Sequence, residues 1–234
     1  MKTFVIGGIQ KLTLLDFPGK VACTLFTVGC NFRCPFCHNA SLVLAPNEAE
    51  YYSTEEILGY LKTRQGILEG VCISGGEPTL MPGLEDFIRS VKKLGFAVKL
   101  DTNGSRPEIL KHLVDEGLID YVAMDIKNSR EKYTLTCGLD DGYDISNIEE
   151  SAAFLMSGAI DFEFRTTVVD PLHEADDFVR IGEWLAGNEK YFLQKFVSSS
   201  DIIGRGMDAF SDEEMREFLS TLKSFVPNAQ LRGI

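Results

Sequence analysis

The chain has 234 residues, of which 44% are hydrophobic and 25% are charged, and its formal net charge is −12 at pH 7. This composition is ordinary for a globular protein, and the length suits one large α/β domain or two small ones. The acidic excess lacks the electrostatic footprint of a nucleic-acid-binding protein. We therefore expect a chain that buries a core of its own and has no nucleic-acid partner.

The first 20 residues do not form a secretory signal, because a single early lysine precedes a short apolar run that glycines interrupt. No stretch reaches the ~18 consecutive apolar residues of a membrane-spanning helix. These features predict a cytoplasmic protein with reduced thiols and no membrane partner. Six cysteines are too sparse for a disulfide scaffold in a chain of this length, so a local cluster of them needs another explanation.

Six apolar segments of strand length alternate with segments of helical periodicity. Strands are predicted where β-branched and aromatic residues are frequent, at 21–28, 70–74, 96–101, 119–126, 160–169 and 190–197. Helices are predicted between and after them, at 54–63, 84–94, 106–116, 146–157, 174–186 and 211–224. Strict alternation predicts a parallel sheet with right-handed crossovers, either open or rolled into a partial barrel.

Sequence signals mark where several of these helices begin. Ser53 with Glu56, and Ser211 with Glu214, have the spacing of a capping box. In the segment 84–94, apolar residues recur at the spacing of one helical face. These local signals support the predicted alternation of strands and helices.

Polar residues and glycines recur where the predicted strands end. They are the cysteine loop after the first strand, Ser74 to Pro78, Asp101 to Gly104, Met124 to Lys127, Arg165, and Gln194 with Lys195. The carboxyl ends of parallel strands meet at one edge, where ligands bind in open sheets and in barrels alike. This convergence predicts a site built from several loops.

Residues 29–39 read GCNFRCPFCHN and place Cys30, Cys34 and Cys37 within eight residues, followed directly by His38. Structural zinc sites normally take four ligands, often from two CxxC pairs. The sequence has no second such pair, and adjacent residues such as Cys37 and His38 seldom reach one metal ion. A zinc site and a disulfide framework are therefore the weaker interpretations.

Three thiolates suit a [4Fe–4S] cluster, which usually has four cysteine ligands. Cys23 and Cys72 lie in predicted strands and are interpreted as small buried side chains, whereas Cys137 is expected in a loop as a free thiol. The simplest alternative is that one iron lacks a protein ligand. Such an iron can bind a substrate or cofactor, as the open position of a catalytic zinc does.

The Cys-x3-Cys-x2-Cys motif, with Phe36 directly before its last cysteine, resembles the radical S-adenosylmethionine (SAM) superfamily. Gly75-Gly76-Glu77-Pro78 looks like the GGEP element of that superfamily, which binds the amino group of SAM. The physical chemistry agrees, because glycines let the backbone approach closely and a carboxylate pairs with an ammonium group. Together the two motifs are a more specific signal than the cysteines alone.

The resemblance implies a radical reaction and the residues that would bind its cofactors. Cys30, Cys34 and Cys37 would hold a [4Fe–4S] cluster as its metal ligands, and the unligated iron would be chelated by the amino and carboxylate groups of SAM. The reduced cluster would donate an electron to break the sulfonium bond, and the resulting 5′-deoxyadenosyl radical would abstract a hydrogen atom. Because residues 40–53 contain no cysteine, we expect one cluster.

The segments CPFCHN, DTNG and MDIK together resemble the activases of glycyl-radical enzymes. Residues 14–39, LLDFPGKVACTLFTVGCNFRCPFCHN, are similar to activating proteins of anaerobic ribonucleoside-triphosphate reductase. They also parallel the D-G-P-G-x-R segment of pyruvate formate-lyase activases, from which Phe17 and Lys20 depart. The partner implied is a large glycyl-radical enzyme, with a reduced flavodoxin or ferredoxin-type protein as electron donor.

The same resemblance assigns further cofactor-binding residues. Asn39 would contact the carboxylate or ribose of SAM, and Asp101 and Asp125 would face the cofactor, with Asp125 near the ribose. Lys127 and Arg165 would counter the SAM carboxylate, although a surface ion pair is a comparable interpretation of Arg165. The two carboxylates are also a candidate site for a small cation beside SAM.

The fold that the resemblance implies is an α/β partial (β/α)6 barrel of parallel strands, with an iron–sulfur loop after the first strand and a single radical SAM domain over residues 1–234. Three functions are weighed: a glycyl-radical activase, a radical SAM enzyme acting on a small molecule, such as a deazaguanine synthase, and a non-enzymatic zinc or electron-transfer module. The chemistry of the cysteine loop favours the first two.

Overall fold

The computed structural model describes residues 4–44, 51–199 and 201–234. An eight-stranded sheet forms its centre, with the strands in chain order. They are β1 (Ile6–Thr13), β2 (Ala22–Thr27), β3 (Gly70–Gly75), β4 (Ala97–Thr102), β5 (Tyr121–Asp125), β6 (Phe162–Val168), β7 (Tyr191–Lys195) and β8 (Gln230–Arg232). All neighbours from β2 to β8 pair in parallel, and β1 pairs antiparallel with β2.

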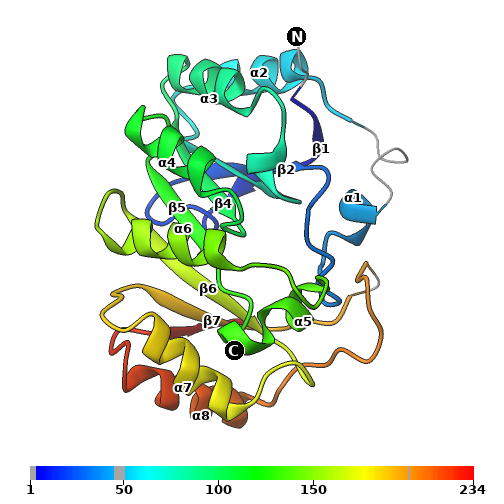
Figure 1. Ribbon diagram of the computed structural model, residues 1–234. Helices are drawn as coiled ribbons and strands as arrows, with labels where there is room; N and C mark the ends of the chain where they lie inside the picture. The colour runs from blue at the N-terminus through cyan, green and yellow to red at the C-terminus, as the bar shows by residue number, and fades with distance from the viewer. Residues whose placement is uncertain (1–3, 45–50, 200) are drawn as a thin grey trace.

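Strands β2 to β7 are the six strands predicted from the sequence, so the expected parallel sheet is confirmed. The edge strands β1 and β8 are not neighbours in the hydrogen-bonded order. Figure 1 shows the sheet curving between these edges, with α2, α3, α4, α6, α7 and α8 around its outer side. The fold is therefore an open partial barrel, extended by one strand at each edge.

The helices are α1 (Ala40–Leu44), α2 (Thr54–Lys62), α3 (Leu84–Lys93), α4 (Pro107–Asp115), α5 (Tyr133–Cys137), α6 (Ser146–Met156), α7 (Ala175–Trp184) and α8 (Asp212–Lys223), with short 3-10 turns η2 (Pro78–Leu80) and η3 (Arg130–Lys132). The six predicted helices are present, while α1 and α5 were not predicted. Both lie on the side of the sheet away from the six outer helices (Figure 1). Within the described ranges, no helix is long and apolar enough to cross a membrane.

Local sequence determines where these helices begin. The predicted capping boxes of α2 and α8 are both formed, by Ser53 with Glu56 and by Ser211 with Glu214. Each serine accepts a hydrogen bond from a backbone N–H group of the first turn, which otherwise has no partner within the helix. The apolar stripe of α3 packs into the hydrophobic core, with Phe87 and Val91 buried.

The strand register places the charged residues of the barrel interior close to one another on neighbouring strands. Asp101 of β4 pairs with Ala123 of β5, and Asp125 pairs with Arg165 of β6. Lys99 lies two residues before Asp101 on the same strand, so both side chains project from the same face. The polar strand ends expected from the sequence therefore meet above the barrel interior.

Candidate functional site

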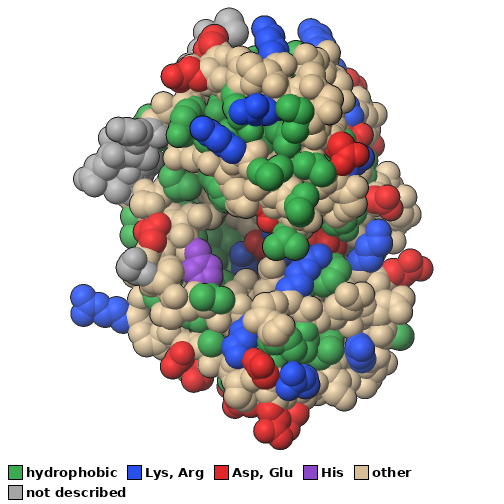
Figure 2. Space-filling view, turned by 180° about the vertical axis from the view of Figure 1, so that it is seen from behind, with side chains coloured by type: hydrophobic (Ala, Val, Ile, Leu, Met, Phe, Trp, Pro, Cys, Tyr) green, Lys and Arg blue, Asp and Glu red, His purple; other side chains and the backbone are tan. Residues whose placement is uncertain are grey.

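A cavity of about 810 Å³, including its open mouth, lies at the carboxyl ends of the strands. Eleven of the thirteen predicted site residues line it: Cys30, Cys34, Phe36, Cys37, Asn39, Gly75, Gly76, Asp101, Asp125, Lys127 and Arg165. Figure 2 shows a hollow near the centre of one face, with charged side chains of both signs at its floor. The predicted convergence of several loops is thus present, except that Gln194 and Lys195 do not line the cavity and Lys195 pairs with Asp212 instead.

The cysteine loop follows β2 and is held in a compact conformation. The N–H of Cys37 donates to the carbonyl of Cys34 at 3.0 Å. Two donors point at the Cys30 sulfur, namely the Phe32 N–H at 3.3 Å and the Asn103 side-chain amide at 3.8 Å. The three thiols are free and line one cavity, where donors to sulfur are already in place.

The protonation of the three thiols differs. Burial raises the pKa of Cys30 to about 12 and also raises that of Cys37. The pKa of Cys34 is lowered, chiefly because the thiol of Cys137 is within hydrogen-bond reach and also because the Lys127 ammonium is near. Metals bind thiolates, so loading this loop releases protons.

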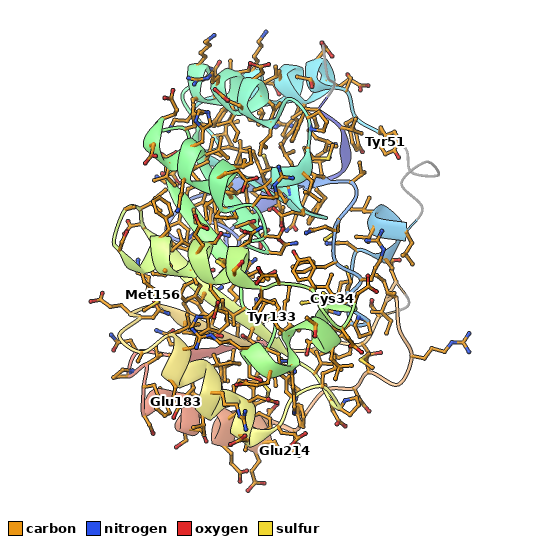
Figure 3. All side chains as sticks on the ribbon, viewed as in Figure 1. Cys34, Tyr51, Tyr133, Met156, Glu183 and Glu214 are labelled. Carbon is orange, nitrogen blue, oxygen red and sulfur yellow. The ribbon has the colours of Figure 1, made fainter. Side chains whose placement is uncertain are left out.

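Cys137 is not in a loop, contrary to the prediction. It ends α5 and is fully buried, and its carbonyl accepts the Arg33 N–H of the cysteine loop at 2.8 Å. Tyr133, labelled near Cys34 in Figure 3, donates to the Asp125 carbonyl at 3.2 Å from the same helix. A five-residue helix has too little periodicity to be recognised in sequence, and its burial against the cysteine loop stabilises it.

Cys23 and Cys72 lie in β2 and β3 and are fully buried. Their interpretation as small core side chains is confirmed. Burial raises the pKa of both thiols, that of Cys23 to about 12. Neither lines the cavity, so the triplet alone supplies thiols to it.

Gly75 and Gly76 bring two chain segments into close contact. A Cβ atom at Gly75 would lie 2.3 Å from the Thr27 nitrogen, and one at Gly76 would lie 1.8 Å from the Gly29 carbonyl oxygen. Any side chain at either position would therefore displace the backbone that leads into the cysteine loop. The Gly75 carbonyl accepts the Asn39 side-chain amide at 2.9 Å.

Glu77 and Pro78 do not line the cavity, which differs from the expected ammonium contact of the Glu77 carboxylate. The Glu77 side chain is fully enclosed. One carboxylate oxygen accepts from the Thr79 N–H and hydroxyl and from the Thr102 hydroxyl, and the other accepts from the Asn103 N–H at 2.7 Å. Its observed role is to join the GGEP turn to the end of β4.

Five charged side chains form a continuous network from the barrel interior to the cavity wall. Lys99 pairs with one oxygen of Asp101, and Arg165 donates to the other at 3.2 Å. Arg165 also contacts Asp125 at 3.0 Å, and Asp125 accepts from Lys127 at 2.9 Å. Arg165 thus lies between two carboxylates at the cavity wall with 14% of its side chain exposed, and the interpretation of it as a surface ion pair is wrong.

The network keeps Asp101, Asp125 and Lys127 ionised. Burial alone would raise the pKa of Asp101, but the charges of Arg165 and Lys99 outweigh it and hold that pKa well below its usual range. The pKa of Asp125 is likewise lowered, since Arg165 and Lys127 outweigh burial. Burial would lower the pKa of Lys127, yet Asp125 and Cys34 raise it. The cavity therefore presents fixed charges near neutral pH.

His38 lines the cavity and also fastens the loop that follows β7. Its ring stacks on Phe196 with centroids 5.1 Å apart, and its Nε2 lies 2.7 Å from the Val197 carbonyl oxygen. The Gly204 N–H donates to the Pro35 carbonyl at 2.6 Å. Sequence reasoning missed this contact, because its partners lie about 160 residues further along the chain.

Comparison with known proteins identifies the family to which the chain belongs. The sequence profile of the radical SAM superfamily matches residues 24–180. The chain belongs to the radical SAM superfamily. The match includes both the cysteine loop and the charged strand ends, and the superfamily implies an iron–sulfur cluster and SAM.

Several members of the superfamily are similar to this chain. MJ1227 of Methanocaldococcus jannaschii, provisionally named as a glycyl-radical enzyme activating enzyme, is 31% identical over 98% of this chain and 96% of its own length. The pyruvate formate-lyase-activating enzyme of Clostridium pasteurianum is 33% identical over 59% of this chain and 55% of its own. A "Probable GTP 3′,8-cyclase" of Thermococcus kodakarensis is 33% identical over 55% and 42%.

Solved structures support the fold of this radical SAM protein. The crystal structure of QueE from Escherichia coli has a TM-score of 0.56 at 19% identity and covers 98% of this chain and 92% of its own. At that identity the likeness concerns the fold alone. It supports the open partial barrel described above.

The residues of this radical SAM protein fit an iron–sulfur cluster. Three unpaired thiols line one cavity, and side-chain and backbone N–H groups point at the Cys30 sulfur. Cluster thiolates commonly accept such hydrogen bonds, which tune the potential. Over the described ranges, no three His, Cys, Asp or Glu side chains are placed to hold a single metal ion. Three thiolates from one loop suit a cluster, in which each thiolate binds a different iron.

Proposed function

We propose that this protein is a radical SAM activase that cleaves SAM reductively at a single [4Fe–4S] cluster and generates a glycyl radical in a large partner enzyme. The observation that carries the proposal is one cavity that holds both the thiols of Cys30, Cys34 and Cys37 and the ion network ending at Lys127. The similarity to MJ1227 along almost the whole chain favours the activase reaction over others in the superfamily.

In this proposal the residues that line the cavity have different roles. The three thiolates hold the cluster, and Phe36 beside them excludes water. Lys127 and Arg165 orient the carboxylate of SAM, because both are cations that line the cavity. When bound, the reduced cluster and SAM supply a 5′-deoxyadenosyl radical that abstracts a hydrogen atom.

The ammonium group of SAM, which is bonded to the same carbon atom as the carboxylate, requires hydrogen-bond acceptors of its own. Gly75 and Gly76 line the cavity, whereas the Glu77 carboxylate is enclosed behind them. We assign the ammonium contact to the backbone of the two glycines, with Asn39 fixing the Gly75 carbonyl. Glu77 then supports this contact from behind, and Pro78 begins the turn η2.

Asp101 and Asp125 face the same cavity as carboxylates. In the proposal Asp125 lies near the ribose and accepts from its hydroxyls, while both carboxylates hold Arg165 in place. A small cation beside SAM is not needed in this arrangement, because Arg165 already lies between the two carboxylates.

The partner proposed is anaerobic ribonucleoside-triphosphate reductase, on the resemblance of residues 14–39. Pyruvate formate-lyase is the second candidate, since a pyruvate formate-lyase-activating enzyme is 33% identical over part of the chain. The electron donor proposed is a reduced flavodoxin or ferredoxin-type protein. We place the activity in an anoxic cytoplasm and in one radical SAM domain over residues 1–234.

A direct experiment tests the activase reaction. The anaerobically reconstituted and reduced protein is mixed with SAM and, in turn, with each candidate glycyl-radical enzyme, and electron paramagnetic resonance is recorded. The expected result is a glycyl-radical signal with one enzyme and none when its acceptor glycine is replaced by alanine. SAM cleavage without a glycyl radical on any candidate would contradict the proposal.

A small-molecule reaction is the alternative, because a GTP 3′,8-cyclase is 33% identical over 55% of this chain. Two further GTP 3′,8-cyclases, of Saccharolobus solfataricus and Saccharolobus islandicus, match 82% and 87% of this chain at 28% and 26% identity. These matches cover only 60% and 64% of the cyclases' own length, against 96% for MJ1227. Turnover of a purine- or pterin-type substrate, such as a deazaguanine synthase would use, in the absence of any protein partner would favour the alternative.

A further inference from the structure

Lys99 is a buried lysine that no motif accounts for. It lies in β4 and is fully buried. Its ammonium contacts the Asp101 carboxylate, and the Cys72 sulfur is 3.9 Å away. Strands of parallel sheets are normally apolar in such positions. A buried charge is costly unless it is paired, so a lysine here calls for an explanation beyond packing.

The ion network that starts at Lys99 contains an unequal number of charges. It has three cations, Lys99, Arg165 and Lys127, and two carboxylates, Asp101 and Asp125. Each carboxylate lies between two cations, so the network begins and ends with a positive charge. One positive charge is therefore left without a partner among these five side chains.

Neither Glu163 nor Glu77, two nearby carboxyl groups, removes this surplus. Glu163 of β6 also faces Arg165, but its carboxylate is bound by both terminal nitrogens of Arg232, each at 2.9 Å. The Tyr121 hydroxyl donates to the same carboxylate. Burial raises the pKa of Glu77, another enclosed carboxyl group, and its four hydrogen bonds come from Thr79, Thr102 and Asn103.

We infer that Lys99 is a positioning residue that makes the cavity selective for a ligand carrying an α-carboxylate. By pairing with Asp101, Lys99 prevents the two carboxylates from fully neutralising Arg165 and Lys127. Lys99 itself does not line the cavity, so it acts through Asp101 and Arg165. This inference rests on the proposed function, in which the ligand is SAM and its carboxylate completes the network.

The test compares two ligands that differ only in the carboxylate. Binding of SAM and of decarboxylated SAM to the reconstituted protein is measured by anaerobic equilibrium dialysis. Lys99→Met keeps the length of the side chain and removes the charge. It is expected to weaken SAM binding about tenfold or more and to change binding of decarboxylated SAM by less than about twofold. Lys92→Met, at a surface pair with Asp120, is the matched control and should change neither.

Two outcomes overturn the inference. Equal weakening of both ligands by Lys99→Met means that Lys99 only supports the fold, and unchanged SAM binding means that its charge is irrelevant to the carboxylate. If the unmodified protein binds neither ligand with its cluster in place, the proposed function fails instead, which is a distinguishable result.

Lys99→Met leaves Asp101 with one cation fewer beside it, which destabilises the folded protein. A second variant keeps the inference testable if Lys99→Met folds poorly. The double variant K99M/D101N removes both members of the pair, which is far less costly than removing one. It also restores the surplus, because Arg165 and Lys127 then face Asp125 alone. Because Asp101 also holds Arg165, the double variant is judged by the ratio of its affinities for SAM and decarboxylated SAM. This ratio is expected to stay within a few-fold of that of the unmodified protein, and a ratio about tenfold lower in a folded double variant contradicts the inference.

Discussion

The Nε2 atom of His38 lies 2.7 Å from the carbonyl oxygen of Val197 and thereby joins the cysteine loop to the segment after β7. A second bond, from the Gly204 N–H to the Pro35 carbonyl, joins the same two segments. The cysteine loop lines the cavity, so this attachment helps to hold the loop in its conformation. His38, which the sequence left without a firm role, is thus a structural link.

Replacing His38 tests this link. His38→Phe keeps a ring that can stack on Phe196 and removes the hydrogen bond to Val197. Losing one hydrogen bond should weaken the attachment by about 1 kcal/mol and speed hydrogen exchange of the Gly204 amide about fivefold. His112→Phe, on the exposed face of α4, is the control. Unchanged exchange at Gly204 would show that the segment is held without His38.

Most of the fold could be predicted because each parallel strand is an apolar, β-branched run of about the right length. β1 escaped prediction because Gly7 and Gly8 lower its strand propensity. Its hydrogen bonds to β2 supply what local preference does not. β8 has three residues and α5 has five, and elements this short are stabilised by tertiary packing rather than by a periodic sequence.

The cavity could be predicted largely because ligands collect at the carboxyl ends of parallel strands. What escaped prediction depends on long-range contacts, such as the enclosure of Glu77 by Thr102 and Asn103. Lys99 did leave a signal, namely a lysine inside an apolar strand, two residues before Asp101 and therefore on the same face. The role of this lysine could be inferred only once the positions of Arg165 and Asp125 were also known.

Cluster binding should depend on the triplet and not on the other cysteines. Cys34→Ala is expected to lower bound iron and sulfide after reconstitution to less than about one quarter, because a cluster left with two protein ligands is poorly held. Cys72→Ala is the matched control, since this thiol is buried in β3 away from the cavity. Equal iron loss in both variants would contradict the assignment of Cys34.

Glu77→Gln should destabilise the folded protein. An amide has one acceptor oxygen, so its NH2 group must face either the Asn103 N–H or the Thr79 N–H and leave a buried donor without a partner. The expected loss is about 1–3 kcal/mol in the free energy of unfolding, measured by urea denaturation. Glu55→Gln, on the exposed first turn of α2, should change that free energy by less than about 0.5 kcal/mol.

His173 should make stability depend on pH. The side chain is buried; its Nδ1 accepts the Val169 N–H at 3.1 Å, and its Nε2 lies 2.9 Å from the Lys127 carbonyl, to which it donates in the neutral form. Burial lowers the pKa of His173 below its usual 6.5. The unfolded chain therefore binds more protons than the folded one as pH falls below about 6.5, and stability is lost in that direction.

The corresponding measurement is the free energy of unfolding between pH 5 and pH 7.5. His173→Gln cannot take up a proton, so its curve should lack up to about 1.4 kcal/mol per pH unit of the slope below pH 6.5. His112→Gln, at an exposed position beside Glu85, should keep the His173 contribution to the slope. Equal slopes for the unmodified protein and His173→Gln would mean that the buried imidazole is protonated as readily in the folded chain as in the unfolded one, despite the Lys127 and Val169 contacts.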